Sequence, residues 1–196
     1  MAYHVIYLPG VNDQKNAPIQ IKALGKWRKF SLEPHFEYLG WNQSEPYQEK
    51  LNKILKMVDS LTATGQAVSL VGVSAGASLA VNVFTERKDK ITAVVLICGK
   101  INNPQTLGDN YKKQNPALLD CVSASDQNAK ALQPQDKQKM LTIRPLFDGT
   151  VAKSDSVIAG VKNQNILSLL HAPSIYLALT LYKRFTINFL KSQELK

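Results

Sequence analysis

The stretch AVSLVGVSAG, residues 67–76, is the most informative part of the chain, because an apolar run ends abruptly at a serine between two glycines. The run is β-branched and aliphatic with almost no polar interruption, which is typical of a strand covered on both faces of a parallel sheet. Residues 75–86, AGASLAVNVFTE, favour a helix. Ser74 is therefore predicted to lie in a tight turn from strand into helix.

Strand and helix patterns alternate along the whole chain. Strands are predicted at 3–9, 36–41, 67–73, 91–98, 139–147 and 165–170, with helices at 17–30, 46–61, 75–86, 116–132 and 173–191. This alternation predicts an α/β fold, a three-layer, doubly wound and mostly parallel sheet of about six strands. A chain of 196 residues can bury a full core, so we expect one domain over 1–196.

The segment 99–138 breaks this rhythm, because it is polar, contains three prolines and holds only one predicted helix. Forty residues between strands is long for a simple connection. We expect it to form a small lid or part of an entrance wall, or alternatively an ordinary crossover helix with ragged flanks.

Composition narrows the classes of partner. The net charge of +9 is spread evenly over both halves and accompanies no nucleic-acid-binding motif, so we expect no nucleic acid partner. No apolar run approaches the roughly 18 residues of a membrane span. The first residues, MAYHVIYLPG, run directly into a strand instead of a secretory signal, which favours the cytoplasm. Cys98 and Cys121 lack metal-site or disulfide spacing and are predicted to be free thiols.

Ser74 has the surroundings of a nucleophile. Functional groups in an open parallel sheet collect at the carboxyl ends of the strands, which is where Ser74 is expected. A sharp strand-to-helix turn strains its backbone and brings the two elements close together, and Gly72 and Gly76 supply the space. The amide of Ala75, at the start of the helix, would point to where an oxyanion forms.

A serine nucleophile needs a base, and the chain has three histidines. His4 lies inside the first predicted strand and His35 precedes the second, so both are expected to be structural or surface residues. His171 follows the sixth strand immediately before the last helix, which is the right position for the base.

An acid that orients the base should follow the fifth strand. Asp148 lies at the end of that strand before a glycine and is the preferred acid, with Asp155 as the alternative. A second oxyanion donor is expected in the loop LPGVND, residues 8–13, after the first strand. The Val11 amide is the first choice as donor and Asn12 the weaker candidate.

These features together resemble the α/β-hydrolase fold superfamily, over nearly the whole chain. The resemblance rests on GVSAG at 72–76, the chain order Ser74, Asp148, His171, and the strand and helix alternation. It is similar to the small, minimal members without a large cap domain. One departure is Pro9-Gly10, where the family usually has His-Gly in the oxyanion loop.

The resemblance implies a serine hydrolase that cleaves an ester, thioester or amide of a small-molecule acyl substrate through an acyl-enzyme, with carboxylesterase-like activity and without a metal or organic cofactor. Two alternatives stay open at this point. One is a non-catalytic binding protein on the same fold, and the other is an acyltransferase or peptidase with the same three residues. Oligomeric state is not predicted.

Overall fold

Six parallel strands form one sheet in the computed structural model, which describes residues 3–194. The strands lie in the order β2-β1-β3-β4-β5-β6, and every neighbouring pair is parallel. Their bounds are β1 (Tyr3–Leu8), β2 (Leu32–Phe36), β3 (Val68–Val73), β4 (Ile91–Ile97), β5 (Met140–Pro145) and β6 (Lys162–Ile166). The predicted α/β fold with a parallel sheet of six strands is confirmed.

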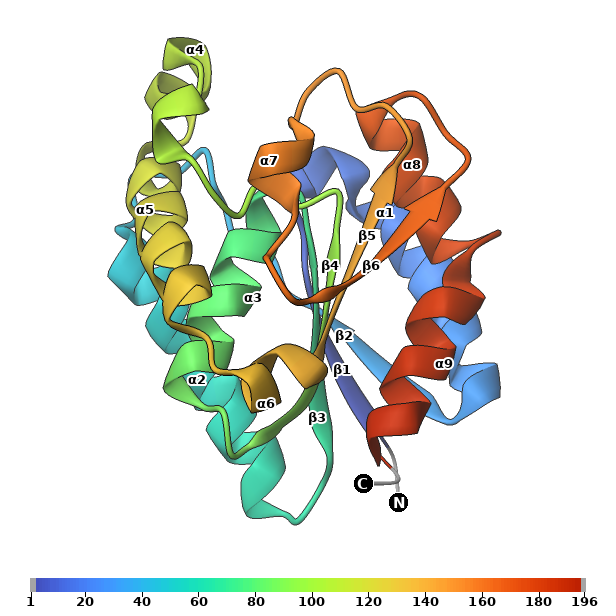
Figure 1. Cartoon of the computed structure of the whole chain (residues 1–196). Helices are drawn as coiled ribbons and strands as arrows, with labels where there is room; N and C mark the ends of the chain where they lie inside the picture. The colour runs from blue at the N-terminus through green and yellow to red at the C-terminus, as the bar shows by residue number, and fades with distance from the viewer. Residues whose placement is uncertain (1–2, 195–196) are drawn as a thin grey trace.

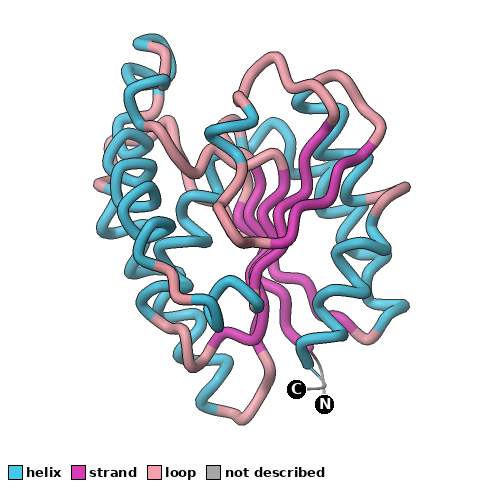
Figure 2. Tube along the Cα trace, viewed as in Figure 1, coloured by secondary structure: helices cyan, strands magenta, loops and turns pink. Residues whose placement is uncertain are grey.

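Helices cover both faces of this twisted sheet, as Figures 1 and 2 show. In Figure 1, α2, α3 and α5 lie on one side of the sheet, and α1, α8 and α9 lie on the other. The α-helices are α1 (Asp13–Gly25), α2 (Tyr47–Ala63), α3 (Ala75–Glu86), α4 (Asp109–Gln114), α5 (Pro116–Ala131), α6 (Pro134–Gln138), α7 (Lys153–Ser156), α8 (His171–Leu179) and α9 (Lys183–Glu194). Two 3-10 helices, η1 (Lys26–Phe30) and η2 (Pro104–Thr106), join them.

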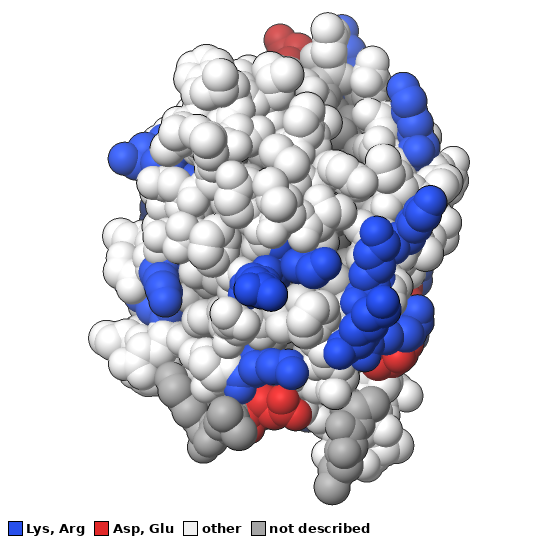
Figure 3. All heavy atoms as spheres, turned by 90° about the vertical axis from the view of Figure 1, so that its right-hand side faces the viewer, with Lys and Arg blue, Asp and Glu red and all other residues white. Residues whose placement is uncertain are grey.

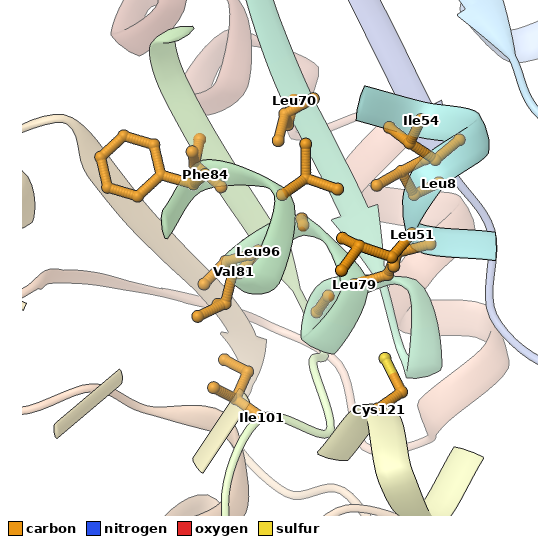
Figure 4. Packing of buried hydrophobic residues seen from close by; sticks show 14 of the residues in the cluster. Leu8, Leu51, Ile54, Leu70, Leu79, Val81, Phe84, Leu96, Ile101 and Cys121 are labelled. Atoms are coloured by element: carbon orange, nitrogen blue, oxygen red, sulfur yellow. The ribbon is translucent and has the colours of Figure 1, made fainter. Parts of the chain in front are cut away.

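Each face of the sheet buries its own hydrophobic cluster, because successive strand residues point to opposite faces. In β1, Ile6 and Leu8 pack beneath α2 and α3, whereas Val5 and Tyr7 pack toward α1 and α9. Figure 4 shows the first cluster, in which Phe84 of α3 belongs to the same packed group as the strand residues. Burial of one such large apolar side chain contributes about 1.5–3 kcal/mol.

The strand order reverses at β1, which lies between β2 and β3. Leu8 at the end of β1 is paired in register with Gly72 of β3. The loop after β1 and the turn after β3 therefore leave the sheet side by side. Open α/β sheets bind their ligands at such a switch point, beyond the carboxyl ends of the strands.

The predicted bounds of the two edge strands were wrong. The second strand was expected at 36–41 and is Leu32–Phe36, and the sixth was expected at 165–170 and is Lys162–Ile166. Both lie at an edge, where a strand is only partly covered and its polar or proline residues are tolerated. Apart from Phe36 and Ile166, which end the two strands, the apolar residues that suggested the other bounds lie in the loops that follow.

Helix bounds also differ in three places. The helix expected at 17–30 begins earlier, at Asp13, and ends at Gly25, where the 3-10 helix η1 follows it. The segment 99–138 holds η2, α4 and α6 besides α5, so the expectation of a single helix there was wrong. The helix expected at 173–191 is divided into α8 and α9, and the division falls at Thr180, whose backbone (φ −119°, ψ −78°) ends α8.

One face of the molecule carries Lys and Arg side chains in several groups. Figure 3 shows the face on the right of Figure 1, where several groups of Lys and Arg are divided by uncharged surface and few acidic side chains appear. No helix within residues 3–194 is long and apolar enough to cross a membrane. The absence of a nucleic acid partner and the location in the cytoplasm stay predictions.

Candidate active site

Ser74 lies in the turn between β3 and α3 with a strained backbone. Its φ of 52° and ψ of −121° fall in a region that non-glycine residues rarely adopt. Such a conformation costs on the order of 1–3 kcal/mol and persists only where its surroundings hold it. The Ser74 amide donates to the Ile97 carbonyl at 3.0 Å, and the Lys100 amide donates to the Ser74 carbonyl at 3.0 Å.

Three glycines allow the elements around Ser74 to approach closely. A Cβ on Gly76 would lie 2.1 Å from the Leu8 carbonyl oxygen, and one on Gly72 would lie 2.5 Å from the Gly76 carbonyl oxygen. A Cβ on Gly10, in the loop after β1, would lie 2.7 Å from the Cβ of Ser74. The glycines on both sides of the serine therefore supply the space that the sequence pattern predicts.

His171 connects Ser74 to a carboxylate. It is the first residue of α8, and its Nε2 lies 3.0 Å from the Ser74 Oγ. Its Nδ1 lies 2.7 Å from Oδ2 of Asp148. A carboxylate can only accept, so Nδ1 carries the proton and Nε2 presents a lone pair to the Ser74 hydroxyl. Side chains that lie 97 and 23 positions apart along the chain thus form one hydrogen-bonded line.

Asp148 is held on both oxygens. Its Oδ1 accepts hydrogen bonds from the backbone amides of Thr150, at 2.8 Å, and Val151, at 3.0 Å. Burial raises the pKa of Asp148, but the hydrogen bonds from His171, Val151 and Thr150 outweigh it, and the pKa is lowered from its ordinary value. The carboxylate is therefore ionised at neutral pH.

Asp155, the alternative acid, has other partners. It lies in α7, and its Oδ2 is 2.6 Å from Nζ of Lys100 and 2.7 Å from Oγ1 of Thr106. Burial raises the pKa of Asp155, yet the bonds from Lys100, Thr106, Asn103 and Ser154 outweigh it, and the pKa is lowered. The geometry thus favours Asp148 as the partner of His171.

The two predicted oxyanion donors lie beside Ser74. Val11 and Ala75 both line a hollow that Ser74 borders, and Ala75 is the first residue of α3, so its amide has no helical acceptor. Within residues 3–194, the backbone hydrogen bonds of the loops and helix caps include none that is donated by the amide of Val11 or of Ala75. Asn12 has a left-handed backbone (φ 58°, ψ 36°) that turns the loop into α1. Their role as oxyanion donors stays a prediction.

The sequence reasoning missed the residues that fix the oxyanion loop. Trp41 donates from Nε1 to the Pro9 carbonyl at 3.1 Å. Asp13, which is only 2% exposed, accepts from the amides of Leu39 and Gly40 at 2.7 and 2.8 Å. These contacts join the loop after β1 to the loop after β2. The one local signal is the place of Asp13 in the first turn of a helix, where an acid is favoured.

Two pockets flank Ser74. The first pocket has a volume of about 150 Å³, and its walls are largely apolar, from Val11, Leu107, Leu118 and Val151, with Lys100 and Asp155 also in its lining. The second pocket, of about 400 Å³, is lined by His171, Leu170, Pro173 and Ile175, together with polar residues of α1 and the loop before it.

The segment 99–138 forms part of these walls. Tyr111 of α4 lines both pockets, and Leu107 and Leu118 line the first. The segment therefore lies next to Ser74, and its movement as a lid stays a prediction.

Both cysteines are buried and free, as predicted from their spacing. Burial raises the pKa of the Cys98 thiol, so it is not an activated nucleophile. Among residues 3–194, no three His, Cys, Asp or Glu side chains gather in an arrangement that could hold a metal ion.

Comparison with solved structures gives many matches, whereas no family model and no curated protein matches the sequence. An α/β hydrolase enzyme from a metagenome of lagoon sediments at Mar Chica, Morocco, has a TM-score of 0.71 at 13% identity over 99% of this chain and 93% of that one. The monoacylglycerol lipase of Paleococcus ferrophilus has a TM-score of 0.66 at 12% identity, over 97% and 94%. Carboxyl esterase 2 of the fungus Tuber melanosporum has a TM-score of 0.68 at 14% identity, over 97% and 78%. Likeness at such low identity shows a shared fold.

Proposed function

We propose that this chain, which has the α/β-hydrolase fold, is a serine hydrolase that cleaves an ester, thioester or amide bond through an acyl-enzyme. The observation that carries the proposal is the hydrogen-bonded line from the Ser74 hydroxyl through His171 to Asp148. Esterases and lipases among the similar structures support the same class of reaction.

In the proposed reaction, Ser74 Oγ attacks the substrate carbonyl while His171 Nε2 takes its proton. Asp148 keeps the His171 ring oriented and stabilises the imidazolium. The Ala75 and Val11 amides hold the oxyanion, and removal of one such donor typically costs on the order of 10² to 10³ in turnover. His171 then returns the proton to the leaving group, and water releases the acyl group by the same steps in reverse.

The leaving group must reach His171, which lines the second of these two pockets and not the first. We therefore assign the acyl group to the first pocket. Lys100 Nζ donates its three hydrogen bonds to Asp155, Thr106 and the Asn103 carbonyl, so it has no N–H left to bind a charged acyl group. The first pocket has a volume of about 150 Å³, and a cavity of that volume admits a group the size of benzene, which has six carbon atoms. We therefore propose carboxylesterase-like activity on short, uncharged acyl groups.

Hydrolysis of p-nitrophenyl butyrate by the purified protein tests the proposal. Ser74→Ala should lower turnover by about 10⁴-fold or more, as loss of an activated serine does in serine hydrolases. The exposed Ser44 provides the matched control, and Ser44→Ala should keep the wild-type rate. A Ser74→Ala variant that retains more than a tenth of the activity would place the nucleophile elsewhere.

A further inference from the structure

The second pocket is the place of the leaving group if the proposed function holds, and the following inference rests on that function. The pocket has a volume of about 400 Å³, larger than the first, and its lining includes His171. Since His171 would protonate the departing oxygen, whatever is attached to that oxygen must occupy this pocket.

One wall of the second pocket is a row of amide side chains. Asn12, Asn16 and Gln20 are spaced four residues apart, which places them on the same face at the start of α1, and all three line the pocket. Besides His171, α8 contributes the apolar side chains of Pro173 and Ile175 to the lining. The pocket thus combines amide groups from α1, which can exchange hydrogen bonds, with apolar groups from α8.

Gln20 is the unusual member of this row. The residue is 8% exposed, and its Oε1 is completely buried yet forms no hydrogen bond with any group of residues 3–194. Buried polar groups in proteins are almost always paired, because an unpaired one loses its hydration without compensation. Gln20 lines the pocket, so a half-turn of its amide about the last side-chain bond would bring this unpaired oxygen to a substrate hydroxyl.

We propose that the second pocket binds an alcohol leaving group that carries further hydroxyl groups, and that Gln20 hydrogen-bonds one of them. The substrate is then an ester of a short, uncharged acid with a hydroxylated alcohol. The acyl side is recognised by size, and the alcohol side is recognised by its hydrogen bonds. Gln20 acts here as a residue that determines specificity, separate from the residues that carry out the chemistry.

Two esters of equal chain length separate this idea from simple hydrophobic binding. Glyceryl 1-butyrate and propyl butyrate share the acyl group and the three-carbon alcohol, and differ only in the two extra hydroxyls. The wild type should have a kcat/KM about fivefold higher for the glyceryl ester, the worth of one net hydrogen bond. Gln20→Leu should abolish this preference, so that its kcat/KM values for the two esters become equal.

Gln14 lies on the exposed side of the same helix and provides the control. Gln14→Leu should keep the wild-type ratio between the two esters. Gln20→Leu should also have an unchanged or higher thermal midpoint, because it removes an unpaired buried amide. Gln20→Met provides a second variant with the same expected outcome.

Three results would overturn the inference. The first is a Gln20→Leu variant that retains the wild-type preference, and the second is a wild type without preference between the esters. The third is a large drop in the thermal midpoint of both Gln20 variants, which would make Gln20 a structural residue. Failure of the proposed function itself would look different, because the wild type would then hydrolyse neither ester.

Discussion

The Asp148→Asn variant should fold normally and lose almost all hydrolytic activity. The backbone amides of Thr150 and Val151 donate to Oδ1 of Asp148, so the oxygen of the new amide would take that position and its NH₂ group would face His171. The opposite orientation would set the NH₂ group against two N–H donors. The NH₂ group can only donate, so His171 Nδ1 would have to accept and its proton would move to Nε2.

The size of the effect follows from this tautomer. With a proton on Nε2, His171 cannot accept the proton of Ser74, from which it lies 3.0 Å away. An equivalent change in serine proteases lowers turnover by about 10⁴-fold, which is about 5 kcal/mol of transition-state stabilisation. The free energy of unfolding should fall by about 1–3 kcal/mol, because the three hydrogen bonds that the Asp148 carboxylate accepts are exchanged for neutral ones.

Asp155→Asn is the matched comparison, and it should lose folding stability while keeping most of its turnover. It removes the carboxylate that pairs with the buried Lys100, whose side chain is 8% exposed. Breaking a buried ion pair in this way costs about 3–5 kcal/mol of folding free energy. At a temperature where the variant is folded, its turnover should stay within about tenfold of wild type, since Asp155 makes no hydrogen bond to His171.

Urea unfolding and p-nitrophenyl butyrate hydrolysis, measured on both variants, give the stability and the turnover separately. The reasoning fails if Asp148→Asn keeps more than a tenth of wild-type turnover. It also fails if folded Asp155→Asn shows the four-order loss expected of Asp148→Asn, because the acid would then have been assigned to the wrong residue.

Three further outcomes follow from the packing and the charges. Gly76→Ala should lower the free energy of unfolding by about 1–3 kcal/mol or more, because its Cβ would lie 2.1 Å from a carbonyl oxygen of β1. Gly25 lies at an open helix end, so Gly25→Ala should leave the thermal midpoint unchanged or raise it. Leu118→Ala should shift the optimum in a p-nitrophenyl ester series to longer acyl chains, while the exposed Leu119→Ala should not. The lowered pKa of Asp155 contributes stability above the ordinary aspartate pKa, and this stability is lost as pH falls through the folded-state value. The urea midpoint should therefore fall below about pH 4, and it should fall less steeply in Asp155→Asn.

The turn at Ser74 could be predicted from sequence because local constraints define it. A buried strand, a helix and two glycines leave one conformation that fits, and the register of β1 with β3 then brings the oxyanion loop beside it. Parallel strands end at one edge, so residues that follow the fifth and sixth strands could be expected to meet Ser74 there. His171 and Asp148 lie within hydrogen-bonding distance for this reason.

Other features depend on contacts between distant parts of the chain. Asp13 accepts hydrogen bonds from amides 26 and 27 positions away, and Lys100 pairs with a carboxylate 55 positions away. The sequence around these residues does not indicate which distant group each one contacts. Edge strands are similarly hard to predict, since their sequences need not be apolar on both faces. The row of amides on α1 has a clear spacing, but only the pocket shows that Gln20 is buried and unpaired.

Labelling with a fluorophosphonate tests the central claim most directly, since only a serine activated by a base reacts with it at an appreciable rate. Peptide mapping of the labelled wild type should find one adduct, on the peptide that contains Ser74, with no adduct in Ser74→Ala and slow labelling in Asp148→Asn. Equal labelling of wild type and Ser74→Ala, or a folded wild type that does not react at all, would contradict the account.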